Sequence, residues 1–104
     1  KNIEQIFANT ANWEMPSKLK DLSLSYIDAS HDTNFVFNDI KNVVSRTKKG
    51  GFVLFHDFSP IYRKNHNWID SVMDGVELAI KKNIIRGPIF NVKHSWVGIW
   101  KKNW

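Results

Sequence analysis

The stretch GGFVLFHDF, from Gly50 to Phe58, places an apolar run between a glycine pair and the polar residues His56 and Asp57. A continuous apolar run of this length is typical of a strand that is buried on both faces of a sheet. Glycine before the run suits a turn, and the histidine and aspartate stand at its end. The stretch therefore predicts a buried strand that delivers an imidazole and a carboxylate to one edge of a sheet.

A second stretch, YIDASHD from Tyr26 to Asp32, repeats this arrangement, because Asp28 and His31 follow another strand-like run. Ligands of open α/β sheets bind outside the carboxyl ends of the parallel strands. Neighbouring strands lie about 5 Å apart, so side chains that follow two such strands can converge. The two stretches indicate one shared site.

Strands and helices alternate along the rest of the chain, which predicts an open α/β sheet with an antiparallel closing strand. We expect one domain over residues 1–104. The elements expected in chain order are a short strand Ile3–Ala8, a loop Asn9–Lys20, a strand Leu22–Ile27, a helix Asn34–Lys48, a strand Phe52–Phe55, a loop Ser59–Asn67, a helix Trp68–Asn83, and a hairpin of Ile89–Val92 and Trp96–Lys101.

The two helices are expected from apolar residues at helical spacing. The first buries Val36, Ile40, Val43, Val44 and Thr47, and the second buries Ile69, Val72, Met73, Val76 and Ile80. Gly50 is the expected left-handed stop of the first helix. Asp32 or Thr33 is expected as the N-cap of the first helix, and Asp39 as a charge on the helix surface. Gly75 is expected to lower the stability of the second helix slightly.

The composition bounds the class of protein. The 104 residues are 42% hydrophobic and contain no cysteine, which excludes disulfides, a thiolate nucleophile and a cysteine zinc site. No apolar run approaches the roughly 20 residues of a membrane span, so we expect a cytoplasmic protein without membrane contact. The net charge of +5 comes from Lys and Arg pairs scattered along the sequence, which makes nucleic acid an unfavoured partner.

The ordered set YIDASHD, FVFNDI, KKGGFVLFHDF and DGVELAI resembles the second half of a class I S-adenosylmethionine-dependent methyltransferase. The resemblance covers about residues 22–101 and is closest to the branch in which one strand ends I-D-G-x-H and the next ends G-G-x4-H-D. It implies a partial Rossmann-like sheet and S-adenosylmethionine as the cofactor. O-methyl transfer to a small-molecule or sugar hydroxyl is the implied activity.

The family fold also begins with a glycine-rich turn and a ribose-binding acid, neither of which is present here. The segment Ile3–Ala8 resembles the family's third strand, after which Asn9 and Thr10 would stand near the adenine, with Asp28 also on the cofactor side. The chain starts at Lys1, and we expect a C-terminal half-domain that is cut from a longer protein or degenerate. Alone, it should not bind S-adenosylmethionine with useful affinity.

The resemblance implies roles for the polar residues. Asp28, His56 and Asp57 match the positions that hold a divalent cation, which binds the acceptor oxygen and eases its deprotonation. His56 is a departure, because an oxygen ligand is commoner there, and a nitrogen favours Mn²⁺ over Mg²⁺ or no metal at all. His31 matches the position of the general base, and an imidazole can take a proton near neutrality.

Each of these residues also has an ordinary structural interpretation. Asp28 could cap the loop into the next helix, and His31 could be an exposed loop histidine. His56 could be a core histidine bonded to a backbone carbonyl, and Asp57 could form an Asx-turn. Trp96 and Trp100 fall on one face of a strand, where packing is the expected role.

Three functions follow. The first is the methyltransferase with a small-molecule acceptor, and the second is a non-catalytic remnant that serves as an interaction or oligomerisation module. The third, disfavoured by the charge pattern, is nucleic-acid binding. An open apolar edge at Leu22–Ile27 invites pairing with a second copy or with Ile3–Ala8, and self-association is the expected outcome.

Overall fold

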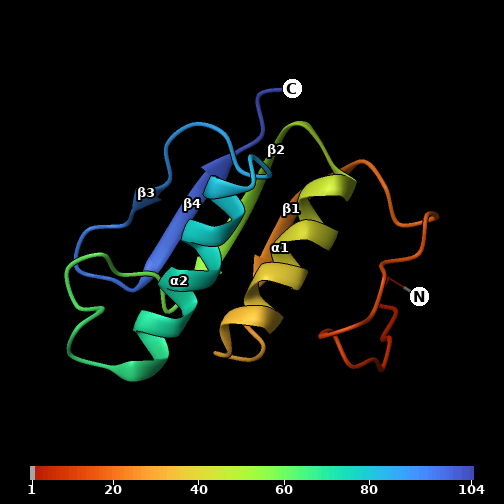
Figure 1. The fold of residues 1–104 in the computed structure, drawn as a ribbon. Helices are drawn as coiled ribbons and strands as arrows, with labels where there is room; N and C mark the ends of the chain where they lie inside the picture. The colour runs from red at the N-terminus through yellow and green to blue at the C-terminus, as the bar shows by residue number, and fades with distance from the viewer. Residues whose placement is uncertain (1) are drawn as a thin grey trace.

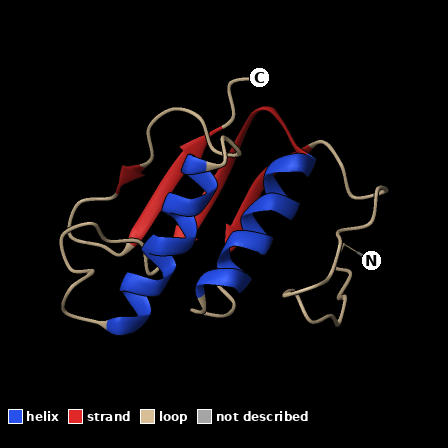
Figure 2. Cartoon of the chain, viewed as in Figure 1, coloured by secondary structure: helices blue, strands red, loops and turns tan. Residues whose placement is uncertain are grey.

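The computed structural model describes residues 2–104, in which a four-stranded sheet is covered by two helices (Figures 1 and 2). The expected α/β architecture is confirmed. The elements in chain order are β1 (Leu22–Ile27), α1 (Thr33–Arg46), β2 (Thr47–His56), α2 (Asn67–Lys81), β3 (Phe90–Asn91) and β4 (Val97–Lys101).

The sheet has the strand order β1-β2-β4-β3. Strands β1 and β2 are parallel, with Ile27 opposite Phe55, so both strands end at the same edge. Strand β4 runs antiparallel to β2, and β3 pairs antiparallel with β4. This is the expected parallel pair with a closing antiparallel hairpin, although β3 is only two residues long.

Both helices lie side by side on one face of the sheet (Figure 1). The core fills the space between this face and the helices, where Val53, Phe55 and Trp100 are almost fully buried. The indole N–H of Trp100 donates to the carbonyl of Arg86 at 2.9 Å, so its buried polar atom is satisfied. The packing role expected for Trp100 is therefore confirmed.

The opposite face of the sheet stays open in the described residues. Leu24, Tyr26 and Phe52 alternate with the buried residues of β1 and β2 and are 64%, 53% and 40% exposed. The chain therefore has an apolar sheet surface that its own helices do not cover.

Gly75 allows α1 and α2 to approach each other closely. A Cβ atom at this position would lie 2.8 Å from Val36 Cβ and 3.0 Å from the carbonyl oxygen of Thr33. Ordinary carbon contacts are about 3.5–4.0 Å, so only glycine fits without a shift. Glycine is therefore needed at position 75 for the packing of α1 against α2. The expectation of a mild loss of helix stability did not include this packing role.

The expected strand Ile3–Ala8 is wrong, because these residues form no strand and Ile3 and Phe7 are 87% and 86% exposed. A segment forms a strand only when a neighbouring strand completes its hydrogen bonds, and within residues 2–104 no strand pairs with this segment. The expected loop Asn9–Lys20 is confirmed. It lies along the outer side of α1 (Figure 1).

Two details of the helices were also wrong. Helix α1 ends at Arg46, because Thr47 is already extended and bonds its hydroxyl to the carbonyl of Val43 at 2.8 Å. Gly50 has a positive φ of 83°, but within β2 and not as a helix stop. In α2, Ala79 is buried and Ile80 is 48% exposed, which places the edge of the buried stripe one residue earlier than expected.

Candidate active site

Two strand ends supply the polar residues predicted from the sequence. Asp28 follows β1, His56 is the last residue of β2, and Asp57 is the next residue. His31 lies in the short loop between β1 and α1. Since β1 and β2 end at the same edge, the expected convergence of these four residues is found.

The contacts among the four side chains are short. His31 Nε2 lies 2.7 Å from Asp57 Oδ2, and His56 Nδ1 lies 3.0 Å from the same oxygen and 3.1 Å from Asp28 Oδ1. The two carboxylates therefore point toward a common centre. A purely capping role for Asp28 does not explain this geometry.

Asp57 is the buried member of the cluster, with 4% of its surface exposed. Its backbone is left-handed, with φ of 54°, a conformation that aspartate tolerates better than most residues. The next residue is fixed by a 2.9 Å backbone hydrogen bond from Phe58 N to Trp96 O. The strand thus turns sharply at Asp57, and neighbouring backbone holds that turn.

The loop before α1 positions His31. Ser30 Oγ accepts from Asp32 N at 3.1 Å, and the carboxylate of Asp32 accepts from Asn34 N at 3.0 Å as the N-cap of α1. The expected cap is confirmed. An ionised carboxylate only accepts hydrogen bonds, so the contact with Asp57 assigns the proton of neutral His31 to Nε2 and leaves Nδ1 as its lone-pair atom.

His56 has an unsatisfied nitrogen. Its Nδ1 is close to both carboxylates, but neither contact has hydrogen-bond geometry, and this buried atom has no hydrogen-bond partner among the described residues. The proposed bond to a backbone carbonyl is not formed at this atom. A buried nitrogen without a partner, beside two carboxylates, is a position where a ligand atom fits.

A divalent cation fits this donor set. Ligand atoms of Asp28, His31 and Asp57 all lie within 4.8 Å of one another. Carboxylate oxygens suit Mg²⁺ and Mn²⁺, and an imidazole nitrogen shifts the preference toward Mn²⁺. The geometry includes His31 in this set, whereas the sequence resemblance placed His56 there.

Tyr26 is a neighbour of the site that sequence reasoning missed. Its ring packs edge-on against the His56 ring, with centroids 6.2 Å apart. Desolvation raises the pKa of its hydroxyl, and the nearby carboxylates of Asp28 and Asp57 raise it further. The available signal was the two-residue spacing to Asp28, which places both side chains toward the same side of the strand end.

A pocket of about 230 Å³ adjoins Asp28 on the α1 side. Thr10, Trp13 and Asp39 contribute to its wall, and Asn9 does not. The Asn9 side chain instead accepts from Ala11 N at 3.1 Å. Of the residues expected on the cofactor side, the structure therefore brings Thr10 and Asp28 to one pocket and leaves Asn9 outside it.

Asp39 lies on the inner wall of this pocket, and its expected role as a surface charge is wrong. The residue is 9% exposed because the N-terminal segment covers it. Burial raises the pKa of its carboxyl, against a smaller lowering by a hydrogen bond from the Thr10 side chain.

The covering segment is held by a ladder of polar side chains along α1. Asn42 donates to Trp13 O and accepts from Met15 N, both at 2.9 Å. Arg46 donates to Met15 O at 2.8 Å, and Asn38 also donates to Trp13 O. These bonds fix the pocket wall formed by residues 10–15.

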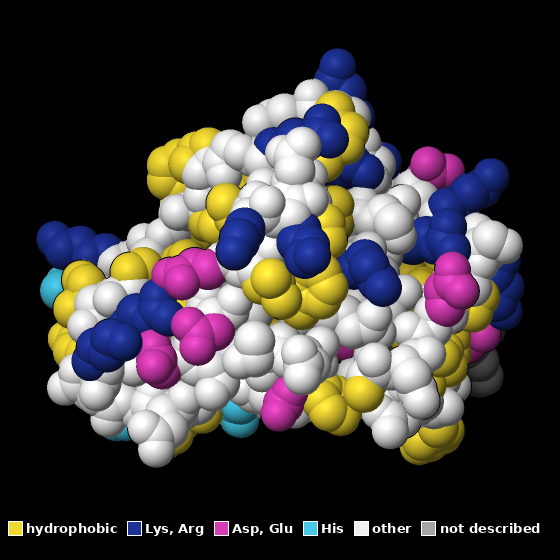
Figure 3. Space-filling model, viewed as in Figure 1, with side chains coloured by type: hydrophobic (Ala, Val, Ile, Leu, Met, Phe, Trp, Pro, Cys, Tyr) yellow, Lys and Arg dark blue, Asp and Glu magenta, His cyan; other side chains and the backbone are white. Residues whose placement is uncertain are grey.

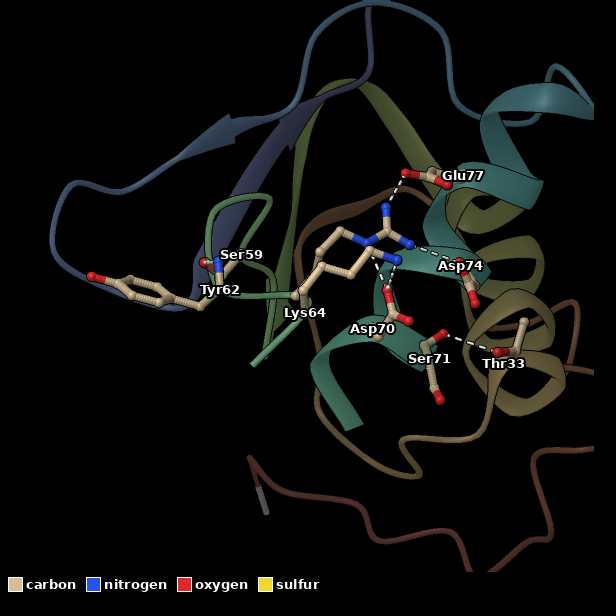
Figure 4. A network of polar contacts seen from close by, with 9 residues as sticks. Thr33, Ser59, Tyr62, Lys64, Asp70, Ser71, Asp74 and Glu77 are labelled. Atoms are coloured by element: carbon tan, nitrogen blue, oxygen red, sulfur yellow. Dashed lines mark hydrogen bonds and ion pairs between the residues drawn. The ribbon is translucent and has the colours of Figure 1, made fainter. Parts of the chain in front are cut away.

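The chain after Asp57 is fastened to α2 (Figure 4). Arg63 binds Asp70 and Asp74 at 2.7 Å each, and also Glu77, so one guanidinium spans about two turns of the helix. The hydrogen bond from Arg63 lowers the pKa of the Asp70 carboxyl. Thr33 joins the start of α1 to Ser71 O at 3.0 Å. Both connections restrain elements that carry the site.

Comparison with known families agrees with this arrangement. A family model described as a methyltransferase domain matches residues 1–58, more than half of the chain. The chain belongs to this methyltransferase-domain family. A comparison with curated proteins gave no match.

The match of the methyltransferase domain extends from the N-terminal segment through Phe58. It therefore includes the pocket wall and all four residues of the acid and imidazole cluster. Methyl transfer is the general activity that the family supports. In residues 2–104, none of the helices has the length and apolar character needed to span a membrane.

Proposed function

We propose that this methyltransferase domain serves S-adenosylmethionine-dependent O-methyl transfer to a small-molecule or sugar hydroxyl. The observation that carries the proposal is the convergence of Asp28, His31 and Asp57 within 4.8 Å at the strand ends. Converging carboxylates beside a buried imidazole nitrogen without a hydrogen-bond partner cost stability unless a ligand completes the site, which favours a chemical role over a structural one. The strand order also supports a C-terminal half of the family fold.

Asp28 and Asp57 would hold a divalent cation, with the unpartnered His56 Nδ1 as a nitrogen donor beside them. Such a cation, when bound, polarises a hydroxyl and lowers its pKa. Thr10 and Asp28 would face the cofactor from the adjoining pocket, and Asn9 supports the same segment from outside the pocket.

His31 is proposed as the general base. Its Nε2–H donates to Asp57, which orients the ring and stabilises the imidazolium that forms when Nδ1 takes the acceptor proton. The His31 side chain is 48% exposed, so an acceptor hydroxyl can approach its Nδ1 atom. S-adenosylmethionine, when bound, would supply the methyl group that the deprotonated oxygen accepts, and S-adenosylhomocysteine would be the leaving group.

The test uses a protein that contains this chain together with a glycine-rich cofactor turn, and follows methyl transfer from labelled S-adenosylmethionine. His31→Ala should lower turnover by about 100-fold or more, and the loss should shrink as the pH rises and the acceptor hydroxyl ionises without a base. Asp28→Asn and Asp57→Asn should lower turnover in a way that excess Mn²⁺ partly restores. Full turnover in His31→Ala at neutral pH would contradict the proposal.

The second candidate is a non-catalytic interaction module. It is favoured by the exposed apolar residues of β1 and by the unpaired edge of that strand, since within residues 2–104 β1 pairs only with β2. Absence of methyl transfer together with stable self-association would select this function.

A further inference from the structure

Seven cationic residues that are scattered in the sequence gather at the end of the sheet opposite the candidate active site. The start of β2, the end of β4 and the end of α2 all lie at this end, because β4 runs antiparallel to β2 (Figure 1). Dark blue side chains accordingly run across the upper part of Figure 3. These residues, called the basic pole below, are Lys48, Lys49, Lys81, Lys82, Arg86, Lys101 and Lys102.

The basic pole accounts for all of the excess positive charge. The chain has fifteen Lys and Arg residues and ten Asp and Glu residues, so without the seven its net charge is negative. Within residues 2–104, the ion pairs involve other cations, namely Lys18, Arg63 and Lys64. The pole therefore presents cations whose charge is not neutralised by neighbouring carboxylates.

Two exposed aromatic rings lie among these cations. Trp104 is 40% exposed, with the Arg86 guanidinium 4.7 Å and the Lys102 ammonium 5.4 Å from its ring. Phe52 is also 40% exposed, with the Lys101 ammonium 5.8 Å from its ring. Lys102 additionally donates to Val44 O and Thr47 O at 2.9 Å, which fixes its position.

We propose that the basic pole binds single-stranded nucleic acid. Cations around exposed aromatic rings match what a single strand offers, because phosphates pair with the cations while unpaired bases stack on the rings. Duplex recognition is disfavoured, since only the C-terminal ends of α1 and α2 reach the pole and neither helix presents its side to a groove. A membrane surface is disfavoured because membrane-binding helices present a continuous apolar stripe beside their cations.

The inference does not depend on the proposed methyl transfer. The pole and the candidate active site stand at opposite ends of β2, which places them on the order of 20 Å apart. The sequence disfavoured nucleic acid because the lysine pairs are dispersed along the chain. The fold changes that assessment by bringing them together.

The experiment measures fluorescence anisotropy of a labelled oligothymidylate of about 16 nucleotides with the 104-residue chain. If about four phosphates are neutralised, raising the salt from about 50 mM to about 200 mM should weaken binding roughly 50-fold. Tryptophan emission should be quenched by the bound bases. No binding at the lower salt concentration would overturn the proposal.

Matched variants locate the binding surface. Lys48→Gln with Lys82→Gln should weaken binding and make the salt dependence shallower, because two cations of the pole are lost. Lys64→Gln with Lys93→Gln removes the same charge at the other end of the sheet and should have little effect. Equal losses in the two double variants would overturn the assignment to the pole.

A further pair of variants tests stacking. Trp104→Ala should weaken oligonucleotide binding about ten-fold, and Trp104→Phe should keep most of the affinity. Circular dichroism of both variants checks that the fold is kept. Binding to phosphatidylserine vesicles without binding to the oligonucleotide, or unchanged affinity in a folded Trp104→Ala chain, would also overturn the proposal.

Discussion

Replacing Gly75 by alanine tests whether the close contact of α1 and α2 holds the candidate site in place. The new Cβ would meet Val36 Cβ at 2.8 Å and Thr33 O at 3.0 Å, so the helices must separate by several tenths of an ångström. Overpacking of this kind costs about 1–3 kcal/mol, whereas alanine gains about 1 kcal/mol over glycine in a helix. We expect a net loss of about 1 kcal/mol.

The loss is measured by urea unfolding, followed through tryptophan emission, to which the buried Trp100 contributes. In a domain of this size, 1 kcal/mol corresponds to a decrease of about 4–8 °C in the melting temperature. Stabilisation by Gly75→Ala would refute the close approach, because it is the result expected for an uncrowded helix position.

A double-mutant cycle supplies the control. Val36→Ala alone removes core contacts and should destabilise the chain, but it also removes Val36 Cγ1, one of the atoms that the new Cβ would meet at 2.8 Å, while the Cβ of residue 36 and Thr33 O remain. The double variant Gly75→Ala, Val36→Ala should therefore be more stable than the sum of the single effects by about 0.5 kcal/mol or more. Simple additivity would show that the two residues do not compete for space.

Three further predictions concern the N-terminal segment, the buried acid and the sheet edge. Asp39→Asn should stabilise the chain at neutral pH. The pKa of the Asp39 carboxyl is higher in the folded state than in the unfolded state, so stability falls as the pH rises from the unfolded pKa through the folded pKa. Asparagine does not ionise and avoids this loss. Urea unfolding over a pH series should show the gain vanish in acid, and a constant gain would contradict this cause. Asn42→Ala should lower stability by about 1–3 kcal/mol, because Trp13 O and Met15 N lose their hydrogen bonds to Asn42. Amide exchange at Met15 should become faster. Unchanged exchange would show that the segment is held by other contacts. The open β1 edge should give concentration-dependent self-association in sedimentation, which Leu24→Lys abolishes, and a monomer at every concentration would contradict it.

Much of the fold was predictable because the information is local. The apolar spacing of Val36 and Ile40 and the continuous run before His56 identify α1 and β2 without further context. The site was predictable for the same reason, since its residues stand directly after strands whose pairing follows from the fold class. These residues meet at one edge of the sheet because parallel strands end at the same edge.

The errors have a different physical origin, because they depend on tertiary neighbours. The position of Asp39 on its helix predicts a surface charge, and only the fold shows that residues 10–15 cover it. Gly75 has a low helix propensity, and only the fold shows that Val36 packs against it. Ile3–Ala8 contains apolar residues that a strand could use, but within residues 2–104 it has no partner strand. The spacing of two residues puts Tyr26 on the same side of the strand end as Asp28, but only the arrangement of β1 and β2 brings its ring beside His56.

The central claim, that Asp28 and Asp57 form one binding site with the adjacent imidazoles, is tested most directly by Mn²⁺ binding to the 104-residue chain. Electron paramagnetic resonance of free Mn²⁺ should reveal one site. Asp28→Asn and Asp57→Asn should each weaken it by about ten-fold or more, while Asp74→Asn, at an exposed carboxylate that binds Arg63, should leave it unchanged. No Mn²⁺ binding, or equal effects of all three substitutions, would contradict the account.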